Sequence, residues 1–207
     1  MTTGRLFRRV AGAGCWLALS CFSLLPASAQ QSSPLNTSGE ILVAGRSTPY
    51  LIRHLPVSSF PDLPEAVQQV LSRRGCLIPQ SYEAHQPENV VHASLEGPGS
   101  SDWAVLCSVE GTASLLVFLS SAPSEPVTLA SAPETERLQQ RNSTGALGFD
   151  WVIDRASPEQ VHEAQTGMNP RPPLLDHDAL ADTAVDQRSV YHYFANGAWT
   201  LARLPEP

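Results

Sequence analysis

The stretch that decides the fold is residues 89–120, which read NVVHASLEGPGSSDWAVLCSVEGTASLLVFLS. Apolar and polar residues alternate over residues 90–95, residues 103–108 are mostly apolar with successive side chains on opposite sides, and residues 113–120 are almost wholly apolar. Alternation of branched and aromatic residues with a period of two is typical of β-strands. A Gly-Pro-Gly sequence separates the first two runs and Glu-Gly separates the last two, and both are turn sequences. We therefore predict three consecutive antiparallel strands that belong to the core.

An amphipathic helix is predicted just before these strands. Asp62 and Glu65 have the spacing of a capping box, and Pro64 lies in the first turn, where its missing N–H does no harm. Apolar residues then recur at helical spacing as far as Leu71, and two arginines fill the last turn. Gly75 is a typical residue to end a helix. We expect the helix to begin at Asp62 and to pack its apolar face on the sheet.

The first 29 residues have the parts of a secretory signal peptide. Three arginines precede an apolar run at residues 10–25, and Ala27-Ser28-Ala29 has the small residues of a cleavage site. The apolar run is shorter than the roughly 20 residues that a membrane-spanning helix needs. The sequence therefore favours cleavage after residue 29 over a membrane anchor. A lipoprotein cleavage before Cys21 is the alternative, and the residues before Cys21 match that motif poorly.

Cleavage there makes the protein extracytoplasmic, either periplasmic or secreted. It removes three arginines and no carboxylate, so ten arginines then face twenty carboxylates and the net charge is −10. The chain contains no lysine. Nucleic acids and anionic membrane surfaces both require basic patches, so this composition argues against either as a partner. Solubility is the simplest explanation of the negative charge.

The remaining 178 residues are enough for one domain with a core. We assign residues 30–48 to a flexible leader or an edge strand, and residues 49–207 to a single domain. Residues 41–44 are a candidate strand, and residues 45–48 a candidate turn. The predicted fold class is α+β: a mainly antiparallel sheet, one amphipathic helix packed on it, two short helices and one disulfide.

The C-terminal half supplies the other predicted elements. Residues 147–154 alternate as a strand does, and Ser157-Pro158 with a glutamine at the third helical position marks a helix start. Asp176 is expected to cap a second short helix that runs to residue 184. Asn196-Gly197 predicts a type I′ hairpin that joins two strands, and it is the clearest local pattern in the chain.

Two cysteines remain after cleavage, Cys76 behind the helix and Cys107 in the second predicted strand. An exported chain meets an oxidising compartment, which favours a disulfide between them. The loop it would close has about 30 residues, worth roughly 3–4 kcal/mol in the chain-entropy model. Two buried free thiols are the alternative. A zinc site would need paired cysteine spacing, which the chain lacks.

Asp176, His177 and Asp178, with Asp182 after them, form the polar cluster that most suggests chemistry. As a functional site they could hold a weakly bound cation through Asp176, Asp178 and Asp182, or use His177 in acid–base catalysis. The structural alternative is a helix cap at Asp176 on a solvated acidic face.

His192 lies between two tyrosines on a predicted strand, where a histidine is usually a packed and hydrogen-bonded core residue. If His177, Asp178 and His192 converged in one cleft, they could serve a small hydrolase or a metal-dependent enzyme. The chain has no Gly-x-Ser-x-Gly sequence, and His162-Glu163 lacks the second histidine of a helical zinc motif.

Several segments together resemble a group of uncharacterised exported proteins of high-GC bacteria. These segments are Arg74–Gln80, Asp102–Ser108, His177–Leu180, Tyr191–Tyr193 and Gly197–Trp199. The resemblance covers most of residues 60–204 and implies no activity, since none is known for the group. It implies that Cys76 and Cys107 pair, because they recur together, and it draws attention to His177 and Asp178.

These observations favour an exported envelope or periplasmic binding or accessory module without a cofactor. Its partner would be an envelope protein or a cell-wall component. The alternative is the small hydrolase or metal-dependent enzyme that would use His177, Asp178 and His192. A purely structural envelope component is the third reading of the sequence.

Overall fold

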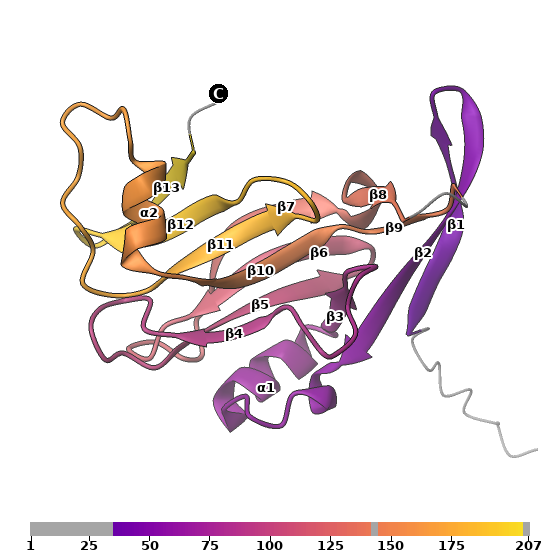
Figure 1. Ribbon diagram of the computed structural model, residues 1–207. Coiled ribbons are helices and arrows are strands. Elements are labelled where there is room, and N and C mark those ends of the chain that lie inside the picture. The colour runs from indigo at the N-terminus through magenta and orange to yellow at the C-terminus, as the bar shows by residue number, and fades with distance from the viewer. Residues whose placement is uncertain (1–34, 142–144, 205–207) are drawn as a thin grey trace, which may run out of the picture. The chain divides into compact units, whose positions relative to one another are not determined.

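The computed structural model describes residues 35–141 and 145–204, which form two β-sheets with two α-helices (Figure 1). The signal peptide predicted at residues 1–29 lies outside the described residues. Within the described part, no helix has the length and apolar character needed to cross a bilayer.

The larger sheet has nine strands and the smaller sheet has four. The larger sheet contains β1 (Asn36–Val43), β2 (Arg46–Pro56), β3 (Leu77–Gln80), β4 (Val90–Ala93), β5 (Asp102–Val109), β6 (Thr112–Phe118), β7 (Val127–Pro133), β8 (Leu138–Gln140) and β9 (Leu147–Phe149). The smaller sheet contains β10 (Trp151–Ala156), β11 (Ala179–Ala184), β12 (Val190–Ala195) and β13 (Ala198–Arg203). The helices are α1 (Glu65–Arg73) and α2 (Pro158–Ala164), with short 3-10 turns η1 (Val57–Ser59) and η2 (Glu134–Glu136).

Strand order in the larger sheet is β7-β6-β5-β3-β2-β9-β8, with β1 paired to β2 and β4 paired to β5. The smaller sheet runs β10-β11-β12-β13. All described pairs are antiparallel except β2 with β9. The prediction of a mainly antiparallel fold is confirmed, but the prediction of one sheet is wrong. The chain changes sheets at Asp150, between β9 and β10. The alternation of apolar and polar residues shows which side chains face the core. It does not show which sheet a strand joins, because the pattern is the same in either sheet.

The two sheets pack face to face, and each carries one helix on its outer face (Figure 1). Leu106 and Leu115 of the larger sheet share the central core with Trp151 and Ile153 of the smaller one. Helix α1 packs on the outer face of the larger sheet, and α2 packs on the outer face of the smaller sheet. The resulting order of layers is α1, larger sheet, smaller sheet, α2.

The three predicted central strands are confirmed as β4, β5 and β6. Leu106 faces the central core and its neighbour Cys107 faces α1, as their alternation predicts. Cys107 forms the predicted disulfide with Cys76, and their Cα atoms lie 5.3 Å apart. The disulfide therefore joins the end of α1 to the second strand of this group.

The predicted start of α1 is wrong, and its predicted end is confirmed. The helix begins at Glu65, with Pro64 as an N-cap that makes no side-chain hydrogen bond. Asp62 instead lies in a turn, which the bond from Leu63 N to Phe60 O closes at 3.2 Å. At the other end Gly75 adopts a φ of 70°, which glycine tolerates without steric cost.

Residues 179–184 form strand β11, not the helix expected after Asp176. The segment is rich in alanine, but it lies between β10 and β12 and pairs with both. Sheet pairing over six residues outweighs a helical propensity of a few tenths of a kcal/mol per residue. The helix predicted from Ser157 is confirmed as α2, and Ser157 and Gln160 form its capping box.

Both terminal hairpins turn on residues with positive φ. Asn196 and Gly197 have φ values of 54° and 78°, which confirms the predicted type I′ turn between β12 and β13. At the N-terminal hairpin the turn residues are Ala44 and Gly45, with φ values of 49° and 78°. The turn expected at residues 45–48 is therefore wrong, because residues 46–48 already belong to β2. Strand β1 pairs only with β2 among the described strands.

Candidate functional site

His177 is fixed by oxygen atoms on both sides of its ring. Its Nδ1 lies 2.8 Å from Asp176 Oδ1, and its Nε2 lies 2.9 Å from the carbonyl oxygen of Phe194. The hydrogen bond from His177 lowers the pKa of Asp176, which is exposed. The pair therefore holds the segment before β11 against the end of β12.

Asp178 joins the start of β11 to the segment after β4. Its backbone N donates to Ser94 O at 2.9 Å, and its Oδ2 accepts from Ser94 N at 3.2 Å. Arg155 lies 3.9 Å away and adds a weak attraction. These bonds give Asp178 a structural role between the two sheets.

His192 pairs with Asp182, and neither His177 nor Asp178 is among its described partners. His192 Nε2 lies 3.0 Å from Asp182 Oδ2, while Asp182 Oδ1 accepts a 2.6 Å bond from the indole N–H of Trp151. The guanidinium of Arg137 lies 4.3 Å from the centre of the Trp151 ring and 3.7 Å from Asp182. The sequence indicated His192 and Asp182 separately. It did not indicate the pairing, which depends on the register of β11 with β12.

Asp150 lies beside this network where the chain changes sheets. Burial raises the pKa of Asp150, and the positive charge of Arg137, whose Nε lies 3.6 Å from Asp150 Oδ1, opposes the shift. Among the described residues, no group of three or more histidine, cysteine or acidic side chains could hold a metal ion. The weak cation-site candidates Asp176, Asp178 and Asp182 each bond to protein groups instead.

The loop of residues 81–88 builds a different candidate site, on the outer side of the larger sheet. Gln80 and Glu88 close the base of the loop. Glu88 N donates to Gln80 Oε1 at 3.0 Å, and Gln80 Nε2 donates to Glu88 O at 3.1 Å. Glu88 Oε1 also accepts from Ser81 N at 2.6 Å. Because both ends are tied, the loop presents the exposed residues His85, Gln86 and Pro87 from a fixed base.

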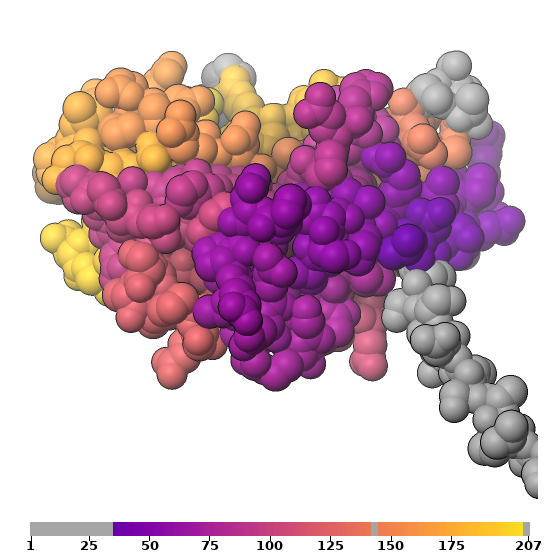
Figure 2. Space-filling model, turned by 90° about the horizontal axis from the view of Figure 1, so that it is seen from below, coloured from indigo at the N-terminus to yellow at the C-terminus, as the bar shows by residue number. Residues whose placement is uncertain are grey.

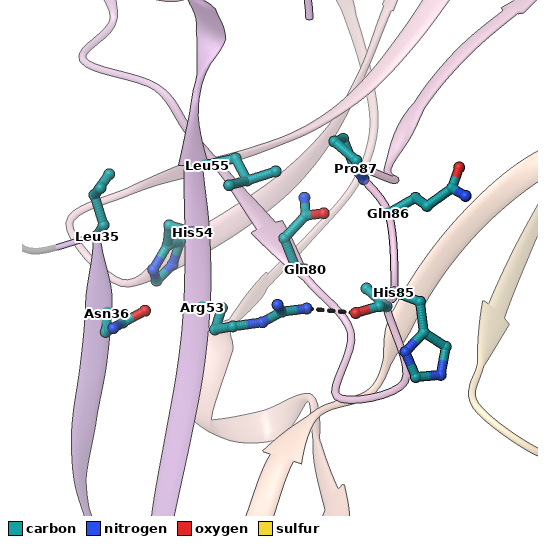
Figure 3. A pocket seen from close by; sticks show the side chains of 10 residues that line it. Leu35, Asn36, Arg53, His54, Leu55, Gln80, His85, Gln86 and Pro87 are labelled. Carbon is teal, nitrogen blue, oxygen red and sulfur yellow. Dashed lines mark hydrogen bonds between the residues drawn. The ribbon is translucent and has the colours of Figure 1, made fainter. Parts of the chain in front are cut away.

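A hollow of about 360 Å³ lies between this loop and β2, and we call it the arginine hollow. Its walls include Arg53 and Leu55 from β2, Gln80 from β3, and His85 and Pro87 from the loop (Figure 3). Arg53 donates to the carbonyl oxygen of Ala84 at 2.7 Å, the bond drawn in Figure 3. The hollow therefore combines apolar walls with side-chain donors.

A second hollow of about 620 Å³, the tryptophan hollow, has one lining residue, Pro87, in common with the first. It lies on the side of the molecule that carries α1, the side seen in Figure 2. Phe60 and Asp62 precede α1 on one wall, and His92 and Trp103 stand on β4 and β5. We call the two hollows together the Pro87 groove.

The rings of His92 and Trp103 stack in the tryptophan hollow. Their centroids are 4.4 Å apart and their planes differ by 15°. The two residues face each other across the β4–β5 ladder, and His92 Nε2 lies 2.8 Å from Ser101 Oγ. His92 is exposed and Trp103 is half-buried. Sequence reasoning placed Trp103 in the core and missed this pair, although the hairpin register contained the signal.

Comparison of the chain with family models, with curated proteins and with solved structures found no match.

Proposed function

We propose that this protein is an exported, non-catalytic binding module that holds an extended ligand in the Pro87 groove. The supporting observation is that the Gln80–Glu88 bonds preform the wall that the two hollows share. A binding surface that is already ordered loses little conformational entropy when the ligand arrives.

The lining of the groove fits a binding site. Ligand pockets are concave and largely apolar, with a few polar groups that orient the ligand. Phe60, Pro87 and Trp103 provide apolar surface, while the side chains of His85 and Gln86 have no partner among the described residues. Such groups are available to a ligand without first breaking a bond within the protein.

The residues that the sequence offered as candidates for an alternative catalytic role lie outside the groove. His177, Asp178 and His192 line neither hollow of the Pro87 groove. All three are instead bonded to groups that connect strands. The partner proposed from the sequence, an envelope protein or a cell-wall component, is a polymer that could lie along such a groove.

The proposal can be tested by amide NMR on the protein lacking residues 1–29. Titration with solubilised peptide and glycan fractions of a bacterial envelope should shift resonances of the loop 81–88 and of β4. Trp103→Ala should remove these shifts, whereas Leu201→Ala, which truncates an exposed side chain on β13, should leave them unchanged. Shifts confined to residues 176–192 would contradict the proposal.

A second candidate is the small hydrolase suggested by His177, Asp178 and His192. The observation in its favour is the 3.0 Å contact of His192 with Asp182, since a histidine oriented by a carboxylate can act as a general base. This candidate predicts hydrolysis of an activated ester that is lost in both His192→Gln and Asp182→Asn and kept in His92→Gln. A rate equal to that of buffer in the wild type would reject it.

A further inference from the structure

We propose that the ligand of the Pro87 groove is a proline-containing peptide in an extended conformation, with a basic side chain that pairs with Asp62. This inference rests on the proposed function and names the chemical class of its ligand.

The aromatic pair favours a proline-rich segment. The polyproline II conformation has no internal hydrogen bonds and is already extended, so it loses little entropy when it binds in aromatic-lined grooves. The tryptophan hollow offers the stacked rings of His92 and Trp103, with Pro87 and Phe60 nearby. The contact of His92 with Ser101 fixes its ring orientation, so the surface is ordered before the ligand binds.

Charge selects the basic side chain. Asp62 is exposed in the wall of the tryptophan hollow, and among the described residues its carboxylate has no hydrogen bond or ion pair. An arginine of the ligand could pair with this carboxylate and also stack on the face of an aromatic ring. The surplus of carboxylates over arginines in the chain would attract such a ligand from a distance.

The arginine hollow suits the backbone of the same ligand. A polyproline II segment exposes all its carbonyl groups and advances about 3.1 Å per residue. On passing Pro87 it would meet the donors of Arg53 and His85 and the side-chain amide of Gln86. Carbonyl groups of the peptide would accept from these donors, whichever side chains the ligand carries there.

The test uses calorimetry on the protein lacking residues 1–29 and two synthetic peptides. One probe is a ten-residue peptide with a central Pro-Arg-Pro-Pro sequence, and the other has glutamate in place of its arginine. We expect the first peptide to bind at least tenfold more tightly. Asp62→Asn should weaken its binding about tenfold, whereas the matched charge removal Glu163→Gln on α2 should not. Asp62→Arg should reverse the preference between the two peptides.

A soluble oligomer of N-acetylglucosamine separates failure of this inference from failure of the proposed function. If the glycan binds and shifts resonances around Trp103 while neither peptide binds, the groove binds ligands but the peptide inference is overturned. If neither class binds there, both proposals fall. Equal affinity of Asp62→Asn and wild type for the basic peptide would also overturn the inference. Should Trp103→Ala fail to fold, His92→Ala removes half of the stacked pair from an exposed position.

The chain has a Pro-Arg-Pro-Pro sequence of its own at residues 170–173, on an exposed loop, so a second copy is a competing occupant. Sedimentation without added peptide distinguishes it. Self-association that Asp62→Asn abolishes would show that the loop of a second copy occupies the groove. That result would overturn the inference of an external peptide ligand. A monomer that binds the basic peptide supports the inference.

Discussion

Asn89 bonds directly to Ile153 across the two sheets: its side-chain Oδ1 accepts a hydrogen bond from the Ile153 backbone N at 3.0 Å. The same amide donates through Nδ2 to the carbonyl oxygens of Pro79 at 2.7 Å and Trp151 at 3.1 Å. Pro79 belongs to the larger sheet, and the other two residues belong to the smaller one. A single buried side chain thus satisfies the backbone of both sheets where they meet.

Replacing Asn89 by alanine should lower the free energy of unfolding by about 3 kcal/mol, because it leaves buried backbone donors and acceptors without hydrogen-bond partners. Asn89 also has a φ of 69°, a conformation that costs other side chains roughly 1 kcal/mol. Asn89→Gly should therefore be the milder substitution, and urea denaturation can measure both. If alanine and glycine were equally harmless, the side-chain amide would have no structural role.

Asp102 should make stability depend on acid pH. Its buried carboxylate accepts bonds from the backbone N of Leu95 and Glu96, both at 2.8 Å, from Ser120 N at 2.7 Å, and from the Ser100 hydroxyl. Burial alone would raise the pKa of Asp102, but these bonds outweigh it and hold the pKa below its ordinary value of 3.8. The stabilisation is therefore present above pH 3.8 and is lost as the pH falls through the lower, folded pKa.

Asp102→Asn tests this linkage. The amide cannot ionise, and its NH₂ group would face backbone donors, so we expect about 2 kcal/mol lower stability at neutral pH. The difference between wild type and variant should shrink below pH 3.8, because the unfolded wild type then binds a proton that the folded carboxylate binds only at lower pH. Denaturant curves from pH 7 to pH 2.5 measure both effects. A constant difference over that range would rule out ionisation as the source.

His54 and Glu134 form a buried pair. Removing one partner should lower the free energy of unfolding more than replacing both partners by apolar residues. Their side chains are each 3% exposed, and His54 Nε2 lies 2.7 Å from Glu134 Oε1. Burial would raise the pKa of Glu134, yet hydrogen bonds from His54 and Ser108 bring it below the ordinary value of 4.5. This contribution is present above pH 4.5 and disappears as the pH falls through the folded pKa.

His54→Leu should cost about 3 kcal/mol, because it leaves Glu134 buried without its partner. The double substitution His54→Leu with Glu134→Leu should recover much of that loss, since it removes both polar partners together. A double-mutant cycle by chemical denaturation gives the coupling free energy. Additive effects of the two single substitutions would contradict a direct interaction.

Local patterns predicted the elements better than they predicted their arrangement. The Asn196-Gly197 turn, the end of α1 at Gly75 and the capping box of α2 depend on neighbouring residues, so the sequence was sufficient for them. The second sheet depends on a change of direction at Asp150, which leaves no mark on the alternation around it. Whether residues 179–184 form a helix or a strand depends on the strands they pair with, which lie elsewhere in the chain.

The candidate site was hidden for a related reason. Pro87, His92 and Asp62 come from three separate segments. In the sequence each has an ordinary role, in a polar loop, on the solvent-exposed side of a strand and as a helix cap. Only the pairing of β4 with β5, together with the Gln80–Glu88 bonds, brings them to one groove. The disulfide could be predicted because only two cysteines follow the predicted cleavage site, and the predicted export to an oxidising compartment favours their pairing.

Gly148 gives the most specific steric prediction. A Cβ at this position would lie 2.5 Å from Tyr82 Cβ and 2.8 Å from Arg141 Cδ. The arginine could move away, but Tyr82 Cβ is tied to the backbone of the loop 81–88, whose Tyr82 N bonds to Phe149 O at 2.9 Å. Gly148→Ala should therefore cost about 1–3 kcal/mol by overpacking.

The same substitution should displace the loop and weaken the binding of any ligand in the Pro87 groove, because that loop forms a wall of the groove. Gly97→Ala is the matched control, since a Cβ there meets no atom within 4 Å and its φ is not in the left-handed region. Thermal unfolding and the calorimetric affinity for the basic peptide measure the two effects. If Gly148→Ala unfolded at the temperature of Gly97→Ala and bound equally well, the loop would have to be movable, and a preformed groove would no longer explain binding.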